Sequence, residues 1–399
     1  MKAISIFSGS MGLDIGLERA GIEVTLGVDV DLAAANTARF NRPNLPFLCA
    51  DVSELSGHQL LEASGHSAVD LLVGGPPCQA FSVYGKRRGI SDARGQVIFQ
   101  YIRLLKEISP PYFVIENVRG LLSMSLPGDK SHGALLRLIV SDLNQLGYHV
   151  DLYVVNSANY GAPQIRERII LIGNNVGVKS VFPAPTHSNR PEDQLIPFRT
   201  LGDALENLID TTCEIMDFSP RKKKYLSLVP PGGNWRMLDI ETQKESMGKA
   251  WGLTGGRSAY WRKLTFEFPC PTVVTMPNHA GTSMCHPTEL RPLSVAECAR
   301  VQEFPDDWCF VGSTADKYRL IGNAVPVRLG QIVGQAVLAL SDAVSSSDAR
   351  SELRASPSYT ETHLRPHVRT RSYFKNGSAT TPISYYDESI TQFQGRLAI

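Results

Sequence analysis

The sequence of 399 residues contains no run of about 18 apolar residues, and no membrane-spanning helix is therefore expected. Its formal net charge is only +1, so a surface that binds a polyanion would have to be local. The seven cysteines include no Cys-x-x-Cys pair, which argues against a zinc site or a redox dithiol, and we expect no metal. Their odd number and irregular spacing favour a reducing compartment such as the cytoplasm. They are Cys49, Cys78, Cys213, Cys270, Cys285, Cys298 and Cys309.

Strand-like and helix-like segments alternate in the first part of the chain, residues 1–185. Apolar runs bounded by turn residues predict strands at Ala3–Phe7, Glu23–Val28, Phe47–Leu48, Asp70–Val73, Tyr112–Ile115, His149–Asn156 and Arg168–Gly173. Segments between them predict helices at Leu13–Ala20, Leu32–Phe40, Gln96–Ile108 and Ala134–Leu146. This alternation predicts an α/β fold with an open, mostly parallel, Rossmann-like sheet covered on both faces. Ligands of such sheets bind beyond the carboxyl ends of the strands.

The pattern changes after this part. Residues 186–290 contain proline-rich and glycine-rich turns and few clear helices, which predicts a smaller, irregular domain. Residues 291–342 are expected to return to the first domain, and Ser294–Glu297 has the spacing of a helix-starting capping box. Residues 343–399 are rich in serine, threonine, proline and arginine and predict a polar, largely disordered tail.

A turn that contains glycine, Phe7–Leu13, joins the first predicted strand to the first predicted helix. Gly9 and Gly12 let the backbone approach a ligand there, and the helix N-terminus favours negative charge. Asp29 follows the second strand, where it is placed to accept hydrogen bonds from ribose hydroxyls. Asp51 follows the third strand, where it either accepts from an exocyclic amine or caps the segment after it. Taken alone, these features fit a tight strand–helix turn or a nicotinamide enzyme equally well.

A candidate nucleophile follows the fourth strand. Two glycines and two prolines, Gly74–Pro77, stiffen the loop that leads to Cys78. A thiol held on such a loop is well placed to attack a substrate, although a free cysteine is more often a small buried hydrophobe. Only the thiolate attacks, so nearby positive charge would favour the reaction.

Further charged side chains follow or precede two other buried strands. Glu116 follows the fifth strand, where a carboxyl group surrounded by little water tends to keep its proton. In isolation it equally fits a helix cap or an ion-pair partner. Gln164, Arg166 and Arg168 alternate onto one side before the last strand. Arginine forks suit carbonyl and phosphate oxygens, although a solvated strand edge is the simpler interpretation of Arg166.

Blocks of these residues, in this order, resemble the motifs of the DNA cytosine-5 methyltransferases. They are Phe7–Leu13, Gly74–Ser82, Asp92–Gln96, Glu116–Val118, Gln164–Arg168, Arg291–Trp308 and Gly322–Pro326. The resemblance implies transfer of a methyl group from S-adenosylmethionine. It implies that Phe7 stacks on the adenine, that Asp29 holds the ribose and that Asp51 meets the adenine amine. The remaining cofactor contacts are expected from Gly9, Gly12, Leu13, Pro76, Asn323 and Val325, while Met11 stands where this family more often has glycine.

The same resemblance implies a division of catalytic roles. Cys78 would add to C6 of a cytosine, and Glu116 would meet N3 of the ring. Arg168 would bind the carbonyl oxygen of the base, and Arg166 would lie near the backbone phosphate. Because the target carbon is inaccessible in a stacked duplex, the base would have to be flipped out.

Duplex DNA is therefore the expected partner. Between Phe218 and Lys263 there are ten Lys or Arg and three Asp or Glu, a local excess of seven positive charges. Such a patch suits phosphate contacts, although a solvated basic loop is the simpler alternative for Lys222–Lys224. Further DNA contacts are expected from Ser82, Lys86, Arg87, Arg88 and Gln164.

The compact chain resembles a prokaryotic, cytoplasmic, monomeric enzyme that serves a restriction-modification system beside a cognate endonuclease. A tRNA cytosine-5 methyltransferase of the same fold and a non-catalytic DNA-binding relative are the alternatives. A tRNA enzyme would carry different residues after the nucleophile loop and a different recognition region. A non-catalytic relative would lack one or more of Cys78, Glu116 and Arg168. A nicotinamide oxidoreductase would explain the first glycine turn and nothing after Gly74.

Overall fold

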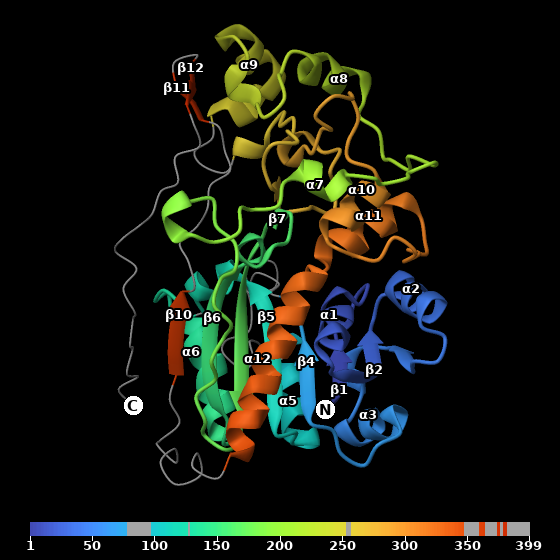
Figure 1. Ribbon diagram of the computed structural model, residues 1–399, viewed down its shortest axis with the longest axis vertical. Coiled ribbons are helices and arrows are strands. Elements are labelled where there is room, and N and C mark those ends of the chain that lie inside the picture. Colours follow the sequence, from blue (N-terminus) through green and yellow to red (C-terminus); the bar gives the residue numbers. More distant parts are fainter. Residues whose placement is uncertain are drawn as a thin grey trace.

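The computed structural model describes residues 1–77, 97–126, 128–252 and 257–346, together with the backbone of three short strands between residues 359 and 380. It is built on an eight-stranded sheet in the order β10-β6-β8-β5-β4-β1-β2-β3 (Figure 1). β8 runs antiparallel to β5 and β6, and the other described pairings in this sheet are parallel. The predicted mostly parallel α/β fold is confirmed. Its strands are β1 (Lys2–Ile6), β2 (Glu23–Asp29), β3 (Phe47–Cys49), β4 (Leu71–Gly74), β5 (Tyr112–Val118), β6 (His149–Asn156), β8 (Glu167–Asn174) and β10 (Tyr359–His363).

Helices cover both faces of the sheet, and alternate residues of each strand face opposite layers. In β5, Phe113 and Ile115 belong to the core cluster that α3, α5 and α6 cover. Tyr112 and Val114 belong to the cluster on the other face, beneath α1 and α12. Both faces of the central strands are therefore buried, as a doubly covered sheet requires. The helices are α1 (Gly12–Ala20), α2 (Leu32–Asn41), α3 (Gly57–Ser64), α5 (Val97–Ile108), α6 (Ala134–Gln145) and α12 (Val327–Ser345).

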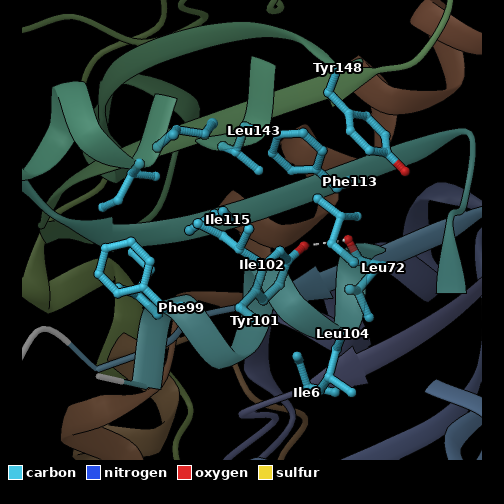
Figure 2. Packing of buried hydrophobic residues seen from close by; sticks show 14 of the residues in the cluster. Ile6, Leu72, Phe99, Tyr101, Ile102, Leu104, Phe113, Ile115, Leu143 and Tyr148 are labelled. Carbon is cyan, nitrogen blue, oxygen red and sulfur yellow. Dashed lines mark hydrogen bonds between the residues drawn. The ribbon is translucent and has the colours of Figure 1, made fainter. Parts of the chain in front are cut away.

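One core cluster holds α5 and α6 behind the strands that carry the site (Figure 2). The rings of Phe113 and Tyr148 meet edge to face, with their centroids 5.3 Å apart. The buried hydroxyl of Tyr101 is shared between the carbonyl oxygens of Leu72 at 2.8 Å and Val114 at 3.0 Å. Burial raises the pKa of Tyr101 well above its usual value, so the hydroxyl keeps its proton and acts as a donor. This contact links α5 to β4 and β5.

The backbones of α1 and α12 lie against each other because both helices carry glycine at their contact. A Cβ on Gly16 would lie 2.4 Å from the carbonyl oxygen of Val327, and a Cβ on Gly330 would lie 2.6 Å from that of Leu13. The stretch Thr314–Ser345 is long and apolar enough to match a membrane span. It comprises two helices, however, and α12 buries its apolar side against the sheet, so it is a core element.

A smaller unit with short helices lies beyond the end of the sheet, at the top of Figure 1. Its own core joins the aromatic residues Phe218, Tyr225, Trp235 and Trp261. Basic residues lie in α8, where the predicted basic patch begins. The helices of this part and of the return segment are α7 (Leu201–Leu205), α8 (Pro220–Ser227), α9 (Ile240–Met247), α10 (Val295–Val301) and α11 (Thr314–Asn323).

The local predictions agree with most strands of the central sheet and differ at several elements. The capping box at Ser294–Glu297 is confirmed, with both of its reciprocal hydrogen bonds present. β5 continues through Glu116–Val118 because β8 pairs with it along this whole length. α11 is not predicted, although its own capping box begins at Ser313. Tyr359–His363 forms a strand within the predicted disordered tail, since the edge of β6 offers backbone groups to which a short extended segment can bond.

Candidate active site

A cavity of about 500 Å³ lies at the carboxyl ends of β1, β2, β4 and β5. Its opposite wall is formed by the segment from Leu320 to Val325, which the return part of the chain brings back. The volume is in the range of pockets that hold small ligands and cofactors. The sequence-predicted residues that line it are Phe7, Gly9, Gly12, Leu13, Asp29, Pro76, Glu116, Arg166, Arg168, Asn323 and Val325.

The loop after β1 is held by the carboxylate of Asp29. One oxygen of Asp29 accepts from the backbone N–H of Gly9 at 2.8 Å, and the other accepts from that of Asp31 at 2.9 Å. Burial raises the pKa of Asp29, while the Gly9 N–H and the nearby Arg319 oppose this shift. Asp31 in turn forms an ion pair with Arg319 of α11. The acid at the end of β2 therefore orders the loop and also lines the cavity, where it can accept from a ligand hydroxyl.

The backbone of this loop is strained at a position where a side chain is unusual. Met11 has φ 68°, in the left-handed region that favours glycine. Its side chain is fully buried in a cluster with Ile15 and Phe304. The next residue must be glycine, because a Cβ on Gly12 would lie 2.3 Å from the carbonyl oxygen of Val325. Burial of the methionine side chain compensates for the strain and keeps the shape of the loop.

Asp51 is placed differently from the other predicted cofactor residues. Its carboxylate accepts from the backbone N–H of Ser53 at 2.8 Å and caps the short helix Val52–Glu54. This hydrogen bond holds the pKa of Asp51 below its usual value. The side chain is exposed and does not line the cavity as described, so the capping alternative is the one that the structure shows.

Glu116 and Arg168 form an ion pair at the chemical end of the cavity. The Nε atom of Arg168 lies 2.7 Å from Oε1 of Glu116, and each side chain is only 11% exposed. A Cβ on Gly75 would lie 3.1 Å from Oε2 of Glu116, so the loop after β4 runs directly beside the carboxylate. The two side chains come from neighbouring antiparallel strands, β5 and β8. The predicted acid, Glu116, and the predicted cation, Arg168, therefore contact each other directly.

Asn117 holds the start of the loop that leads to Cys78. Its side-chain amide donates to the carbonyl oxygen of Pro76 at 2.9 Å, and the residue is buried. Sequence reasoning assigns no role to Asn117, although it lies within the Glu-Asn-Val block. Cys78 itself, together with Ser82 and Lys86–Arg88, lies outside the described residues.

Gln164 and Arg166 have neighbours other than the expected DNA. Gln164 is fully buried in the strand β7 (Gln164–Ile165), which pairs with β9 (Cys270–Pro271). Its amide bonds to the side chain of Gln302 and to the backbone N–H of Val273, so a DNA contact by this side chain finds no support. Arg166 is 2% exposed, and its guanidinium donates to backbone carbonyl groups. It is therefore not placed to contact a DNA phosphate, although the family resemblance implies a position near one. Alternation predicts their common side, but it does not reveal which segments pack over them.

An open, mostly parallel sheet with a cavity at the carboxyl ends of β1 and β2 is the arrangement of S-adenosylmethionine-dependent methyltransferases. Residues 1–339 match the model of the C-5 cytosine-specific DNA methylases, and the chain belongs to this family. It is 36% identical over 339 residues to the Type II methyltransferase M.Sau96I of Staphylococcus aureus, covering 83% of this chain and 74% of the relative. It is 38% identical over 350 residues to the Type II methyltransferase M.Eco47II of Escherichia coli, covering 86% and 80%.

Solved structures share the fold. A protein of E. coli described as a DNA modification methyltransferase encoded within a prophage superposes with a TM-score of 0.60 at 24% identity, covering 86% of this chain and 99% of that chain. DNMT2 of Spodoptera frugiperda superposes with a TM-score of 0.56 at 18% identity, covering 84% and 99%. The enzyme is thus a DNA cytosine-5 methyltransferase, and S-adenosyl-L-methionine is its methyl donor.

The residues present fit this donor. Asp29 offers carboxylate oxygens at the end of β2, where they suit ribose hydroxyls. Gly9 has φ 54° and no described atom within 4 Å of the position of a Cβ, which leaves room for close approach of a ligand. Glu116 and Arg168 line the same cavity, so one space joins the donor site to the candidate reaction site.

Proposed function

We propose that this enzyme methylates C5 of a flipped-out cytosine in a specific duplex DNA sequence through a covalent Cys78 adduct. We further propose that it is the monomeric modification enzyme of a restriction-modification system that includes a cognate endonuclease. One observation carries the mechanism: the ion pair of Glu116 and Arg168 lines the same cavity as the donor-site residues. It lies beside Gly75, three residues before the candidate nucleophile.

The reaction needs a nucleophile because C5 of cytosine does not attack a methyl sulfonium unaided. The Cys78 thiolate adds to C6, a carbon–sulfur bond forms, and electron density moves to C5. S-adenosylmethionine, when bound, would supply an electrophilic methyl group, and its methyl–sulfur bond would break to leave S-adenosylhomocysteine. Once C5 carries the methyl group, its proton leaves to a base such as water, the C5–C6 double bond forms again and the thiolate is expelled.

Glu116 and Arg168 support the addition from the ring edge. The carboxyl group of Glu116, once it carries a proton, donates that proton to N3, where negative charge would otherwise develop as the thiolate adds. Arg168 donates to the carbonyl oxygen of the base and holds the carboxyl group in place. Asn117 contributes indirectly, because its bond to Pro76 fixes the start of the loop that carries the nucleophile. We assign it a positioning role.

The region 186–290 is proposed as the target-recognition domain. Several of its cations lie over aromatic rings: Arg221 is 5.3 Å and Lys224 is 5.2 Å from the ring centroid of Tyr225, and Arg236 is 4.8 Å from that of Trp235. These contacts hold the cations on a unit beyond the end of the sheet, where Lys224 also pairs with Glu245. Together with Ser82 and Lys86–Arg88, this surface supports binding of a DNA backbone.

The alternatives explain less of the chain. Cys78, Glu116 and Arg168 are all present. A non-catalytic DNA-binding relative would not need all three catalytic residues. A nicotinamide enzyme would not explain the Glu116–Arg168 ion pair or the loop after β4. A tRNA cytosine-5 methyltransferase would share the chemistry, so the choice of nucleic acid has to be measured.

Transfer of labelled methyl from S-adenosylmethionine to mixed-sequence duplex DNA and to tRNA tests this function. We expect labelling of DNA by the wild type and loss of at least about 100-fold in Cys78→Ser, because a serine hydroxyl is a far weaker nucleophile than a thiolate. Bisulfite sequencing of the product then gives the methylated site. Cys309→Ser removes an exposed thiol and is the matched control, with wild-type transfer expected.

Each other outcome has a defined meaning. Labelling of tRNA alone would move the enzyme to the other substrate. A Cys78→Ser variant as active as the wild type would exclude the covalent route. Absence of transfer to either nucleic acid by the folded wild type would contradict the proposal.

A further inference from the structure

A buried arginine ties the candidate recognition domain to the wall of the donor cavity. Arg166 donates from Nη1 to the carbonyl oxygen of Val273 at 3.3 Å. From Nη2 it donates to the carbonyl oxygens of Gly322 at 3.1 Å and Asn323 at 3.3 Å. Val273 lies within residues 186–290, just after β9, and packs in the core cluster that the return segment also enters. Gly322 and Asn323 line the cavity. One guanidinium thus contacts two segments that are about fifty residues apart in sequence.

A second, parallel connection runs through two glutamines. Gln164 accepts from the backbone N–H of Val273 at 2.9 Å and donates to Oε1 of Gln302 at 2.9 Å. Gln302 donates in turn to the carbonyl oxygens of Ile321 at 2.6 Å and Ala324 at 3.2 Å. Both glutamine side chains are fully buried, so these bonds are not exchanged with solvent.

The two connected segments also touch directly. A Cβ on Gly322 would lie 2.6 Å from the backbone nitrogen of Thr275 and 2.7 Å from the carbonyl carbon of Val274. Movement of the turn that contains Val273 would therefore be transmitted to Gly322 by contact as well as by hydrogen bonds. The turn and the cavity wall therefore pack directly against each other.

Stability alone is a poor reason for such a network. Burial lowers the pKa of Arg166 well below its usual range, and the neighbouring Arg168 adds to this while Glu116 opposes it. A buried charge gives little net stability compared with an apolar side chain of similar size. What the cation does provide is a fixed geometry for three carbonyl groups on two separate segments.

We propose that Arg166, Gln164 and Gln302 are positioning residues that couple DNA binding by the recognition domain to affinity for S-adenosylmethionine. Bound DNA holds the turn at Val273, and the network then orders the wall Gly322–Val325 before the donor binds. The donor meets a wall that is already ordered, so the two ligands bind cooperatively. By linkage, the donor strengthens DNA binding by the same factor. This inference rests on the proposed function, in which residues 186–290 hold the target DNA.

The coupling is measured as a ratio of two dissociation constants. The probe is S-adenosylhomocysteine, which occupies the donor site without reacting, titrated by calorimetry against the full-length enzyme. One titration is made without DNA and one with a saturating duplex that carries the methylated site found by sequencing. For the wild type we expect DNA to lower the dissociation constant about tenfold, a common size of coupling.

Arg166→Lys should reduce this ratio to about threefold or less, because one ammonium group cannot bond to both segments with the same geometry. Gln302→Met is the second variant, since it keeps the volume and loses the hydrogen bonds. Arg103→Lys is the matched control. Arg103 also donates to two backbone carbonyl groups, those of Val52 and Leu55, but far from the recognition region in sequence, and the wild-type ratio is expected to persist.

The results separate coupling from a merely structural role. A structural role would weaken binding of the probe equally with and without DNA, and an unchanged ratio in both network variants would overturn the inference. A wild-type ratio of one would overturn it as well. If Arg166→Lys fails to fold, Gln302→Met still decides the question. Failure of the proposed function would instead appear as a wild type that transfers no methyl group to DNA.

Discussion

A single buried carboxyl group in the first turn of α1 has consequences at the residue scale. Asp14 is fully buried, close to Ser5 of β1. Burial raises the pKa of Asp14 from 3.8 to about 7; the nearby Ser5 opposes this shift, and the charges of Glu18 and Asp29 add to it. The folded protein therefore binds this proton more tightly than the unfolded chain does. Its stability should fall as the pH rises from about 4 to about 7 and should then level off.

Asp14→Asn should remove this loss, because an amide does not ionise. A shift of about three pKa units corresponds to roughly 4 kcal/mol, and we expect the variant to be more stable than the wild type by about 2–4 kcal/mol at pH 8. At pH 4 the two proteins should be equally stable within about 1 kcal/mol. Urea unfolding at both pH values measures the difference. The control Asp307→Asn changes an exposed carboxyl group and should reproduce the wild-type profile; a matching profile for Asp14→Asn would refute the assignment.

At the scale of elements, the contact between α1 and α12 determines where the cofactor loop lies. α1 begins directly after the loop, and α12 begins directly after the wall segment that ends at Val325. Close approach of their backbones at Gly16 and Gly330 therefore brings the two sides of the cavity together. The approach depends on the absence of side chains at these two positions.

Gly330→Ala should destabilise the protein. Alanine favours a helix over glycine by about 1 kcal/mol. The added Cβ would lie 2.6 Å from the carbonyl oxygen of Leu13 and 3.1 Å from the Cα atom of Gly16, and backbone atoms cannot move aside as a flexible side chain can. Overpacking of this kind costs about 1–3 kcal/mol or more, so the net effect should be a loss.

Thermal unfolding with and without S-adenosylhomocysteine measures this effect, and weaker binding of the probe should accompany the lower Tm. The control is Gly252→Ala, where no described atom lies within 4 Å of the added Cβ. A Tm for Gly330→Ala equal to or above that of the wild type would show that the two helices can separate without cost.

At the scale of the whole molecule, the chain continues past the region that matches the family and returns to the sheet. The family match ends at residue 339, whereas β10 pairs in parallel with β6 at the edge of the sheet (Figure 1). Among the described residues, those that line the donor cavity lie between Ser5 and Val325. β10 covers the edge of β6, which would otherwise be open to pairing with another chain.

Removal of residues 347–399 should leave methyl transfer per folded molecule within about twofold of the wild type, since the barrier to the reaction is set inside the cavity. It should also increase self-association, because the edge of β6 loses its partner. Light scattering and transfer of labelled methyl on the same samples check both statements. A truncated enzyme that is monomeric, folded and inactive would show that the tail takes part in catalysis.

Much of the candidate site could be predicted from short segments of the sequence. Phe7, Gly9, Asp29 and Pro76 follow strands whose apolar runs are visible in the sequence, and the carboxyl ends of parallel strands must meet at one edge. The ion pair of Glu116 with Arg168 could not be predicted from these local patterns. It depends on β8 running antiparallel beside β5, which a list of strands in chain order does not specify.

The sequence by itself determined the elements, the turn chemistry and the family, because hydrophobic periodicity, glycine and proline act over a few residues. Only the tertiary structure decided the surroundings of side chains that those local patterns treat alike. Alternation places Gln164, Arg166 and Arg168 on one side of the strand. Arg168 forms the ion pair with Glu116 in the cavity. Gln164 and Arg166 are instead buried by the segments around residues 273 and 322. Such contacts join segments more than a hundred residues apart, and close packing rather than local preference selects them.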